Sequence, residues 1–226
     1  DVHFDLQPGK VLGLLGRTGS GKTTLARLVF RLYDVNAGSV ALGGADVRQP
    51  TLRQLRQRVA LVTQDVQLFQ ATVRDNLTFF DRSISDERIM EVIETLGLSE
   101  WFASLTDGLD TELQSSGRGL SAGEGQLLAF TRIFLRDPGL VILDEASSRL
   151  DPATEALIER AVDRLLENRT AIVIAHRLGT VHRADEIMIL DHGRTVEHGP
   201  RTALAVDEGS RFHHLLQTGG LQEVLA

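Results

Sequence analysis

Short apolar runs alternate along the chain with stretches in which apolar residues recur at helical spacing. The runs KVLGLLG (10–16), QRVALVTQ (57–64) and TAIVIAH (170–176) are typical of buried strands. Between them, TTLARLVFRLY (23–33) and DPATEALIERAVDRLLE (151–167) have the periodicity of amphipathic helices. Strands that alternate with helices predict an α/β fold with a mainly parallel sheet.

Three further segments extend the strand pattern: SVALGG (39–44), GLVILDE (139–145) and EIMIL (186–190). The last of these is followed by DHGRTVEHG (191–199), which predicts a hairpin with Gly193 in its turn. The strand pattern therefore continues to about residue 200.

A helical segment interrupts the strand pattern between residues 71 and 125. Within SDERIMEVIETLGL, which Ser85 opens as N-cap, four apolar residues share one helix face: Ile89, Val92, Ile93 and Leu96. We therefore expect an α/β core, a helical subdomain inserted in it, and a C-terminal helical tail. The expected bounds are 1–70 and 126–205 for the core, 71–125 for the helical subdomain, and 206–226 for the tail.

Composition narrows the classes of function. The chain has 24 Lys plus Arg against 31 Asp plus Glu, a formal charge of −7, which argues against a nucleic-acid partner. It has no cysteine, which excludes disulfides and thiolate metal sites. Its longest apolar runs, such as AIVIA (171–175), are far shorter than the about 20 residues of a membrane-spanning helix. Any connection to a membrane is therefore expected through another segment or subunit.

The stretch GRTGSGKTT follows the first strand and opens the first helix, and it matches the P-loop pattern G-x-x-x-x-G-K-[ST]. Its glycines allow backbone N–H groups to curl around phosphate oxygens, and the helix N-terminus favours the same anion. We expect Lys22, an exposed loop charge, to reach the β- and γ-phosphates, and the Thr23 hydroxyl to ligate Mg²⁺. The nucleotide-binding residues expected here are Gly16, Arg17, Thr18, Gly19, Ser20, Gly21, Lys22, Thr23 and Thr24.

Two acids at the end of the strand LVILDE would complete such a site. Asp144 is expected to hold Mg²⁺ through water, and Glu145 to act as the base that polarises the attacking water. Two acids at a strand end are common in other proteins, so this assignment depends on the P-loop upstream.

With these motifs and the segment LSAGE, the chain resembles the ATP-binding cassette (ABC) ATPases over nearly its whole length. The resemblance implies a P-loop, RecA-like ATPase core with an inserted helical signature subdomain, and ATP and Mg²⁺ as cofactors. It also implies that Gln64 contacts Mg²⁺ and senses a transmembrane partner, and that His176 contacts the γ-phosphate. Asp151, in SRLD, resembles the family's D-loop aspartate, which crosses a dimer interface, and it is also a good N-cap.

The segment LSAGEGQLLAFTR (120–132) resembles the family's signature, usually Leu-Ser-Gly-Gly-Gln, which binds the ATP held by the opposite subunit. Ser121 and Glu124 also fit a capping box at a helix start, where unpaired N–H groups attract anions. The resemblance implies a head-to-tail dimer in which Ser121 and Gly123 contact ATP in trans. Ala122 and Glu124 depart from the family pattern, one by adding a methyl group and the other a negative charge, so we expect a weakened signature.

The segments LRQLRQRVALVTQDVQLFQATVRDNLTFF and AIVIAHRLGTVHRADEIMILDHGRTVEHG resemble the exporter branch of the family. The resemblance implies a second nucleotide-binding domain as partner, identical or not. It also implies a transmembrane domain on the same full-length polypeptide and a place on the cytoplasmic face of a membrane. Ser115 stands where exporters carry a glutamate. The aromatic residue that the family stacks on adenine would precede DVHFDL, so we expect a domain of a longer protein.

Two alternatives stay open at this point. One is an ABC ATPase that acts on DNA or ribosomes rather than in transport; the acidic charge balance argues against it. The other is a regulatory half of a heterodimer that binds nucleotide without hydrolysis; the presence of Glu145 argues against that alternative.

Overall fold

Two compact units make up the structure, a computed structural model that describes residues 2–63, 66–113, 120–144, 152–175 and 181–217. The first unit comprises residues 1–63, 138–147 and 168–226, and the second comprises residues 64–137 and 148–167. The subdomain bounds expected from the sequence, at residues 71, 126 and 206, stay a prediction.

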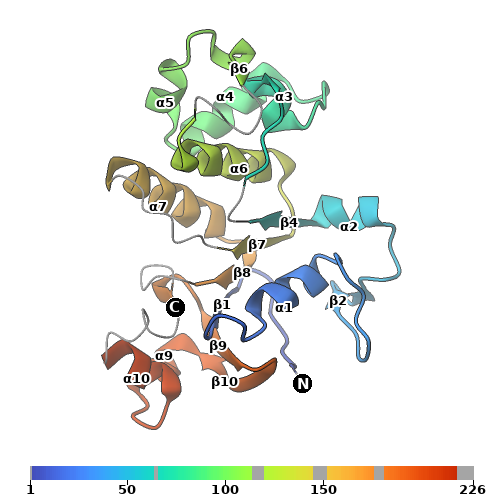
Figure 1. Cartoon of the computed structure of the whole chain (residues 1–226), viewed down its shortest axis with the longest axis vertical. Helices are drawn as coiled ribbons and strands as arrows, with labels where there is room; N and C mark the ends of the chain where they lie inside the picture. The colour runs from blue at the N-terminus through green and yellow to red at the C-terminus, as the bar shows by residue number, and fades with distance from the viewer. Residues whose placement is uncertain (1, 64–65, 114–119, 145–151, 176–180, 218–226) are drawn as a thin grey trace. The chain divides into compact units, whose positions relative to one another are not determined.

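A six-stranded sheet forms the centre of the first unit, in the order β10-β9-β1-β8-β7-β4 (Figure 1). Each neighbouring pair is parallel except β10 and β9, which form the expected antiparallel hairpin. The strands are β1 Val11–Leu15, β4 Val59–Val62, β7 Leu140–Asp144, β8 Thr170–Ile174, β9 Glu186–Asp191 and β10 Arg194–Pro200. The predicted α/β class with a mainly parallel sheet is confirmed.

Shorter elements accompany the sheet in this unit. They are α1 Lys22–Val29, β2 Ala41–Leu42, β3 Ala45–Asp46, α2 Leu52–Arg58, α9 Arg201–Val206 and α10 Arg211–Gln217. The helix expected over 23–33 ends earlier, because Arg31 has a φ of 53°, which no α-helix accommodates. The strand expected over 39–44 shortens to β2, because Gly43 and Gly44 both take positive φ in the turn to β3.

The core of the first unit is one cluster of buried apolar side chains from the sheet and α1, with contributions from α2 and the segment after β3. Alternate residues of β1, β7, β8 and β9 enter it, as the period of two in a strand requires. Its members are Leu12, Leu14, Ala26, Val29, Val47, Leu55, Val59, Leu140, Ile142, Ile172, Ile174, Met188 and Leu190.

The second unit is mainly helical. Its elements are β5 Ala71–Thr72, α3 Val73–Thr78, α4 Asp86–Thr95, α5 Ser99–Ala103, the 3₁₀ turn η1 Gly108–Asp110, β6 Glu112–Leu113, α6 Ala122–Arg136 and α7 Pro152–Leu166. Helix α6 packs against α3, α4 and α7. Ser85 caps α4 as expected, since its side chain accepts from Arg88 N. Of the helices in the described ranges, none is both long and apolar enough to cross a membrane.

A buried arginine joins α6 to α3 within the second unit. Arg132 donates from Nε to Asn76 O at 2.7 Å and from Nη2 to Asn76 Oδ1 at 3.2 Å, and its Nη1 donates to Gln67 O at 2.9 Å. Burial lowers the pKa of Arg132 to about 10. These bonds satisfy a cation that would otherwise be costly to bury.

Candidate nucleotide-binding site

The carboxyl ends of three strands meet at one edge of the sheet. In the parallel register, Leu14 of β1 pairs with Ile174 of β8, and Ile174 pairs with Asp144 of β7. The residue after Leu15 is the first glycine of the P-loop, so this loop and Asp144 reach the same edge. In open α/β sheets such an edge is where ligands bind.

The P-loop needs glycine at its start because the backbone there packs against a neighbouring strand. A Cβ added at Gly16 would lie 2.2 Å from Leu190 O and 2.6 Å from Ser20 Oγ, and Gly16 has a φ of 143°. At the other end of the loop Gly21 is the N-cap of α1, in the left-handed conformation with a φ of 108°. Both positions therefore exclude a side chain for reasons of space or conformation.

Polar groups of the loop are left for a ligand. Helix α1, with Gly21 as its N-cap, has no side-chain hydrogen bond to its first N–H groups, unlike a helix that opens with serine or threonine. Ser20 is 3% exposed, and its Oγ has no hydrogen-bond partner among the described residues. N–H groups without a side-chain cap and a buried hydroxyl fit the oxygens of a phosphate.

Lys22 is buried at 6% exposure, which corrects the expectation of an exposed loop charge. Its Nζ donates to Gly16 O and, at 3.1 Å, to Arg17 O, so the amine bends back over its own loop. Burial lowers the pKa of Lys22, while the nearby Asp144 carboxylate raises it. The ammonium therefore lies inside the loop, where a phosphate would replace carbonyl oxygens as its partner.

Thr23 and Asp144 come together across the sheet edge. Thr23 Oγ1 donates to Asp144 Oδ2 at 3.4 Å, a long hydrogen bond. A hydroxyl and a carboxylate are hard oxygen ligands, which Mg²⁺ prefers, and Mg²⁺ commonly completes its shell with water and substrate phosphates. Among the described residues, no cluster of three His, Cys, Asp or Glu forms an all-protein metal site. This donor set fits a metal that is bound together with a nucleotide.

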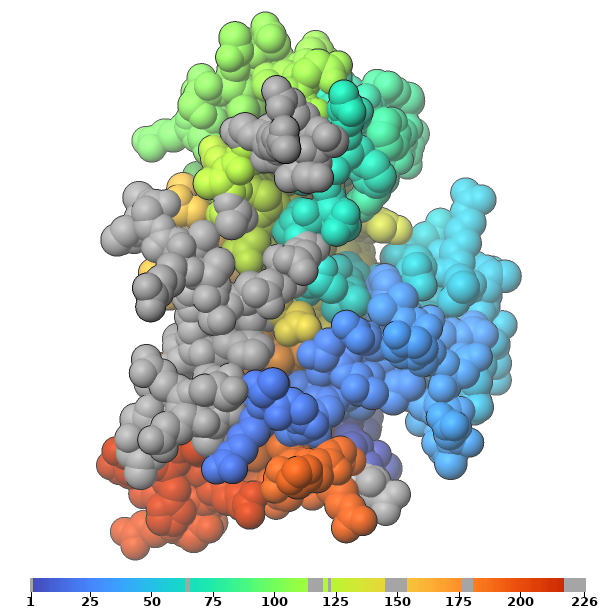
Figure 2. Space-filling view, in the orientation of Figure 1, coloured from blue at the N-terminus to red at the C-terminus, as the bar shows by residue number. Residues whose placement is uncertain are grey.

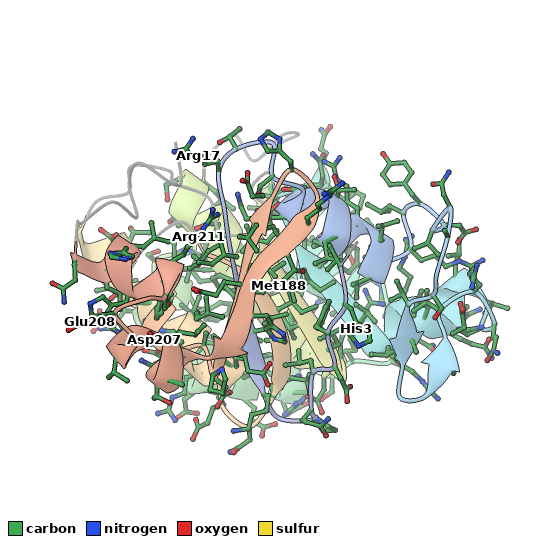
Figure 3. The ribbon with its side chains drawn as sticks, turned by 90° about the horizontal axis from the view of Figure 1, so that it is seen from below. His3, Arg17, Met188, Asp207, Glu208 and Arg211 are labelled. Atoms are coloured by element: carbon green, nitrogen blue, oxygen red, sulfur yellow. The ribbon has the colours of Figure 1, made fainter. Side chains whose placement is uncertain are left out.

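A cavity of about 730 Å³ adjoins residues 16–20 of the P-loop. Its other walls come from β9, the turn after it and α10: Ile189, Leu190, Asp191, His192, Arg211, His214 and Leu215. Gly193 N donates to Ser20 O at 2.8 Å, so the hairpin turn and the P-loop meet at the surface (Figure 2). Figure 3 labels Arg17 and Arg211, the two arginines of the cavity wall. The α10 residues of this wall were not predicted from the sequence, because they belong to no motif.

The signature segment opens α6 in the second unit. Ser121 Oγ accepts from Glu124 N at 3.2 Å, and Glu124 Oε2 accepts from Ser121 N at 2.6 Å, so the expected capping box is confirmed. Ser121 is exposed and Gly123 is buried. Within this box, the N–H groups of the first two helical residues have no side-chain acceptor.

Several expected site residues lie outside the described part of the chain: Gln64, Glu145, Asp151 and His176. Within the described part, Arg17, Thr18, Gly19 and Thr24 are exposed around the P-loop. The structure thus brings together the P-loop, Thr23 and Asp144.

A P-loop at the end of a central parallel strand, with an aspartate from the next strand but one beside its threonine, defines an α/β protein that binds nucleoside triphosphates. A family model described as ABC transporter matches residues 1–148. The chain therefore belongs to the ABC transporter family, and the expected ABC-type ATP-binding domain with a P-loop core is confirmed.

Similar proteins include transporters of several bacteria. The chain is 41% identical over 208 residues (92% of this chain, 34% of the relative) to an uncharacterized ABC transporter ATP-binding protein, YknV, of Bacillus subtilis. It is 39% identical over 221 residues (98% and 38%) to the beta-(1-->2)glucan export ATP-binding/permease protein NdvA of Agrobacterium vitis. It is 43% identical over 216 residues (95% and 37%) to the ATP-dependent lipid A-core flippase of Chromobacterium violaceum. The chain spans about a third of the length of these relatives. Because it belongs to the ABC transporter family, it is an ATPase domain of the ABC type.

Proposed function

We propose that the chain is the Mg²⁺-dependent, ATP-hydrolysing module of an ABC exporter, and that ATP-driven dimerisation of this module powers transport by a membrane domain. One observation carries the proposal: Lys22, Thr23 and Asp144 meet at a single edge of the parallel sheet. The relatives named for export and lipid A-core flipping support the transport role.

Nucleotide binding would use groups that the P-loop leaves available. The first N–H groups of α1 and the Ser20 hydroxyl would donate to phosphate oxygens, and the helix dipole favours the same charge. Lys22 would exchange its two carbonyl partners for the β- and γ-phosphates. Arg17, Thr18, Gly19 and Thr24 would complete the loop's contacts.

For hydrolysis, Thr23 and Asp144 would hold Mg²⁺, the aspartate through water. Bound there, the metal would neutralise charge on the phosphate oxygens. Glu145 follows Asp144 directly and would accept the proton of the attacking water as general base. Following the family pattern, Gln64 would contribute to the metal shell and His176 would contact the γ-phosphate.

The partners of the chain follow from the same proposal. A second nucleotide-binding domain would present its own P-loop to Ser121, Gly123 and Asp151 of this chain, so that ATP lies between the subunits. The membrane domain would belong to the same polypeptide, and this chain would lie at the cytoplasmic face of the membrane. Residues 71–125 would form the helical signature subdomain of the family.

The test is phosphate release by the purified chain, with Mg²⁺ and with the metal removed by EDTA. We expect release that requires Mg²⁺ and rises more than linearly with protein concentration, because two chains would form each site. Release that EDTA leaves unchanged would contradict the metal assignment. Tight ATP binding without release in any pairing would favour the regulatory, non-hydrolysing half over the proposal.

A further inference from the structure

Both carboxylate oxygens of Glu124 accept hydrogen bonds from N–H groups, and they do so from two different elements. Oε2 accepts from the Ser121 backbone at 2.6 Å, within the capping box of α6. Oε1 accepts from the indole Nε1 of Trp101 on α5, at 3.1 Å. Trp101 is 8% exposed, so its indole N–H depends on this partner more than a solvated group would.

A second capping box in the chain shows what such a box requires by itself. At the start of α2, Thr51 and Gln54 form the same motif with an amide in place of the acid. The single oxygen Gln54 Oε1 accepts from Thr51 N at 3.0 Å and from Thr51 Oγ1 at 2.9 Å. A glutamine therefore suffices for a capping box, and the box alone does not account for the acid at position 124.

The difference between the two helix starts is the added indole donor. At α6 the two donors reach two different oxygens of Glu124. The single oxygen of an amide could take only one of these places, so its NH₂ group would face the other N–H as donor against donor. A carboxylate has two acceptor oxygens and matches both donors at once. Tryptophan at 101 and glutamate at 124 are therefore a matched pair.

We infer that Trp101 is a positioning residue for the signature segment: it holds the Glu124 carboxylate toward α5, and the pair fixes Ser121 and the first N–H groups of α6. This inference rests on the proposed function, in which that helix start contacts ATP of the partner subunit. The sequence alone predicts that the charge of Glu124 weakens the signature, whereas this pairing gives Glu124 a positioning role. Because its oxygens are engaged by N–H donors, the acid organises the phosphate-binding end of the helix.

Substitution of either residue of the pair should loosen the start of α6. Trp101→Phe keeps an aromatic ring and removes only the indole donor, so Glu124 loses one of its two restraints. Glu124→Gln restores the family's residue, yet it sets an amide NH₂ against one N–H. Both changes should loosen the start of α6 and weaken the trans contact with ATP.

The experiment measures ATP-dependent dimerisation of the whole chain by light scattering, with Glu145→Gln in every sample to prevent turnover. Four chains are compared: the parent, Trp101→Phe, Glu124→Gln and the double variant. We expect each single variant to need roughly three- to tenfold more ATP for half-maximal dimerisation, the effect of one lost hydrogen bond. Because the two residues act through one bond, the double variant should need no more ATP than Glu124→Gln alone.

The matched control is Gln54→Glu, which places an acid in the capping box of α2. There the side-chain oxygen of residue 54 contacts Thr51 of the same box. We expect no change in the ATP requirement of that variant. Since the chain has one tryptophan, its emission reports on Trp101 directly. Addition of Mg-ATP should change the emission of the parent over the same ATP range as dimerisation, and change that of Glu124→Gln less.

The outcomes separate the inference from the proposed function. An unchanged ATP requirement in Trp101→Phe and Glu124→Gln, or additive effects in the double variant, would overturn the role of Trp101. A parent chain that binds ATP but forms no ATP-dependent dimer would instead overturn the proposed function, and the inference with it. Should Trp101→Phe fold poorly, as a thermal melt would reveal, Glu124→Gln decides alone.

Discussion

The Thr23 hydroxyl donates to the Asp144 carboxylate across 3.4 Å, although 121 positions separate the two residues in the chain. The contact joins the start of α1 to the end of β7. The same two oxygens would ligate Mg²⁺, directly for Thr23 and through water for Asp144. A bond of this length is weak, so a metal can replace it at little cost.

Thr23→Val is expected to raise the Mg²⁺ concentration needed for half-maximal ATPase activity by about tenfold or more, the loss of one strong ligand. The side chain keeps its shape and α1 has no threonine cap, so the fold should persist. A magnesium titration measures the effect. Thr95→Val, which removes a helix hydroxyl bonded to Glu91 O, is the control. Equal magnesium requirements in Thr23→Val and the control would contradict the assignment.

Lys22→Ala should abolish productive Mg-ATP binding, because it removes the cation that the loop encloses. The substitution should also lower the stability of the fold, since Lys22 donates to Gly16 O and Arg17 O. A thermal melt should therefore accompany the titration of a fluorescent ATP analogue. Lys22→Met, which keeps most of the buried volume, serves as the second variant. Parent-like affinity in a folded variant would remove the lysine from the site.

Glu145→Gln should lower ATP turnover by about 10²–10⁴-fold, the range of a general base, and leave ATP binding intact. The amide keeps the shape of the side chain and cannot accept the proton. An ATP-bound dimer should therefore accumulate, which size-exclusion chromatography with Mg-ATP would detect. Unchanged phosphate release, in a pairing where the parent is active, would exclude Glu145 from the mechanism.

Ala122→Gly tests the other departure of the signature from the family pattern, separately from Glu124. Removal of the methyl group lets the backbone N–H groups approach a phosphate more closely. We expect ATP-dependent dimerisation at roughly two- to fivefold lower ATP, an effect below one full hydrogen bond. Light scattering in the Glu145→Gln background measures it. If dimerisation is unchanged or weaker, the alanine is a fully working variant of the signature.

Asp185 provides a pH-dependent test of how β1 is held. Its Oδ2 accepts from Val11 N and its Oδ1 from Lys10 Nζ, both at 2.9 Å. Burial alone would raise the pKa of Asp185, but these hydrogen bonds lower it below its usual range. Because the folded-state pKa is below the unfolded one, the stabilisation is present above the unfolded value of about 4 and is lost as the pH falls through the folded value.

The measurement is the melting temperature of the parent and of Asp185→Asn at several pH values. At pH 7 the variant should melt about 2–4 °C lower, equivalent to about 1 kcal/mol for a chain of this size and discounted for partial exposure. The difference should shrink below about pH 4. A difference that is constant with pH would show that the charge of Asp185 contributes nothing.

The sequence by itself determined the α/β class, the P-loop and the helix caps, because each is a local property. The spacing GRTGSGKT already requires a glycine-rich turn between a strand and a helix, and the Ser121 to Glu124 spacing already predicts a capping box. The hairpin around Gly193 and the cap at Ser85 were predictable for the same reason. Each of these features depends on residues within a few positions of one another.

Only the tertiary structure decided which distant residues meet. Parallel pairing of β1, β8 and β7 brings the Asp144 carboxylate to Thr23 and buries Lys22, and no local pattern contains that register. Packing of α5 likewise turns the indole of Trp101 to Glu124, so that an acid which looks like a defect in the signature becomes an acceptor for two donors. The physical reason is common to both cases: hydrogen bonds and burial depend on distance in space, which the fold sets for residues far apart in sequence.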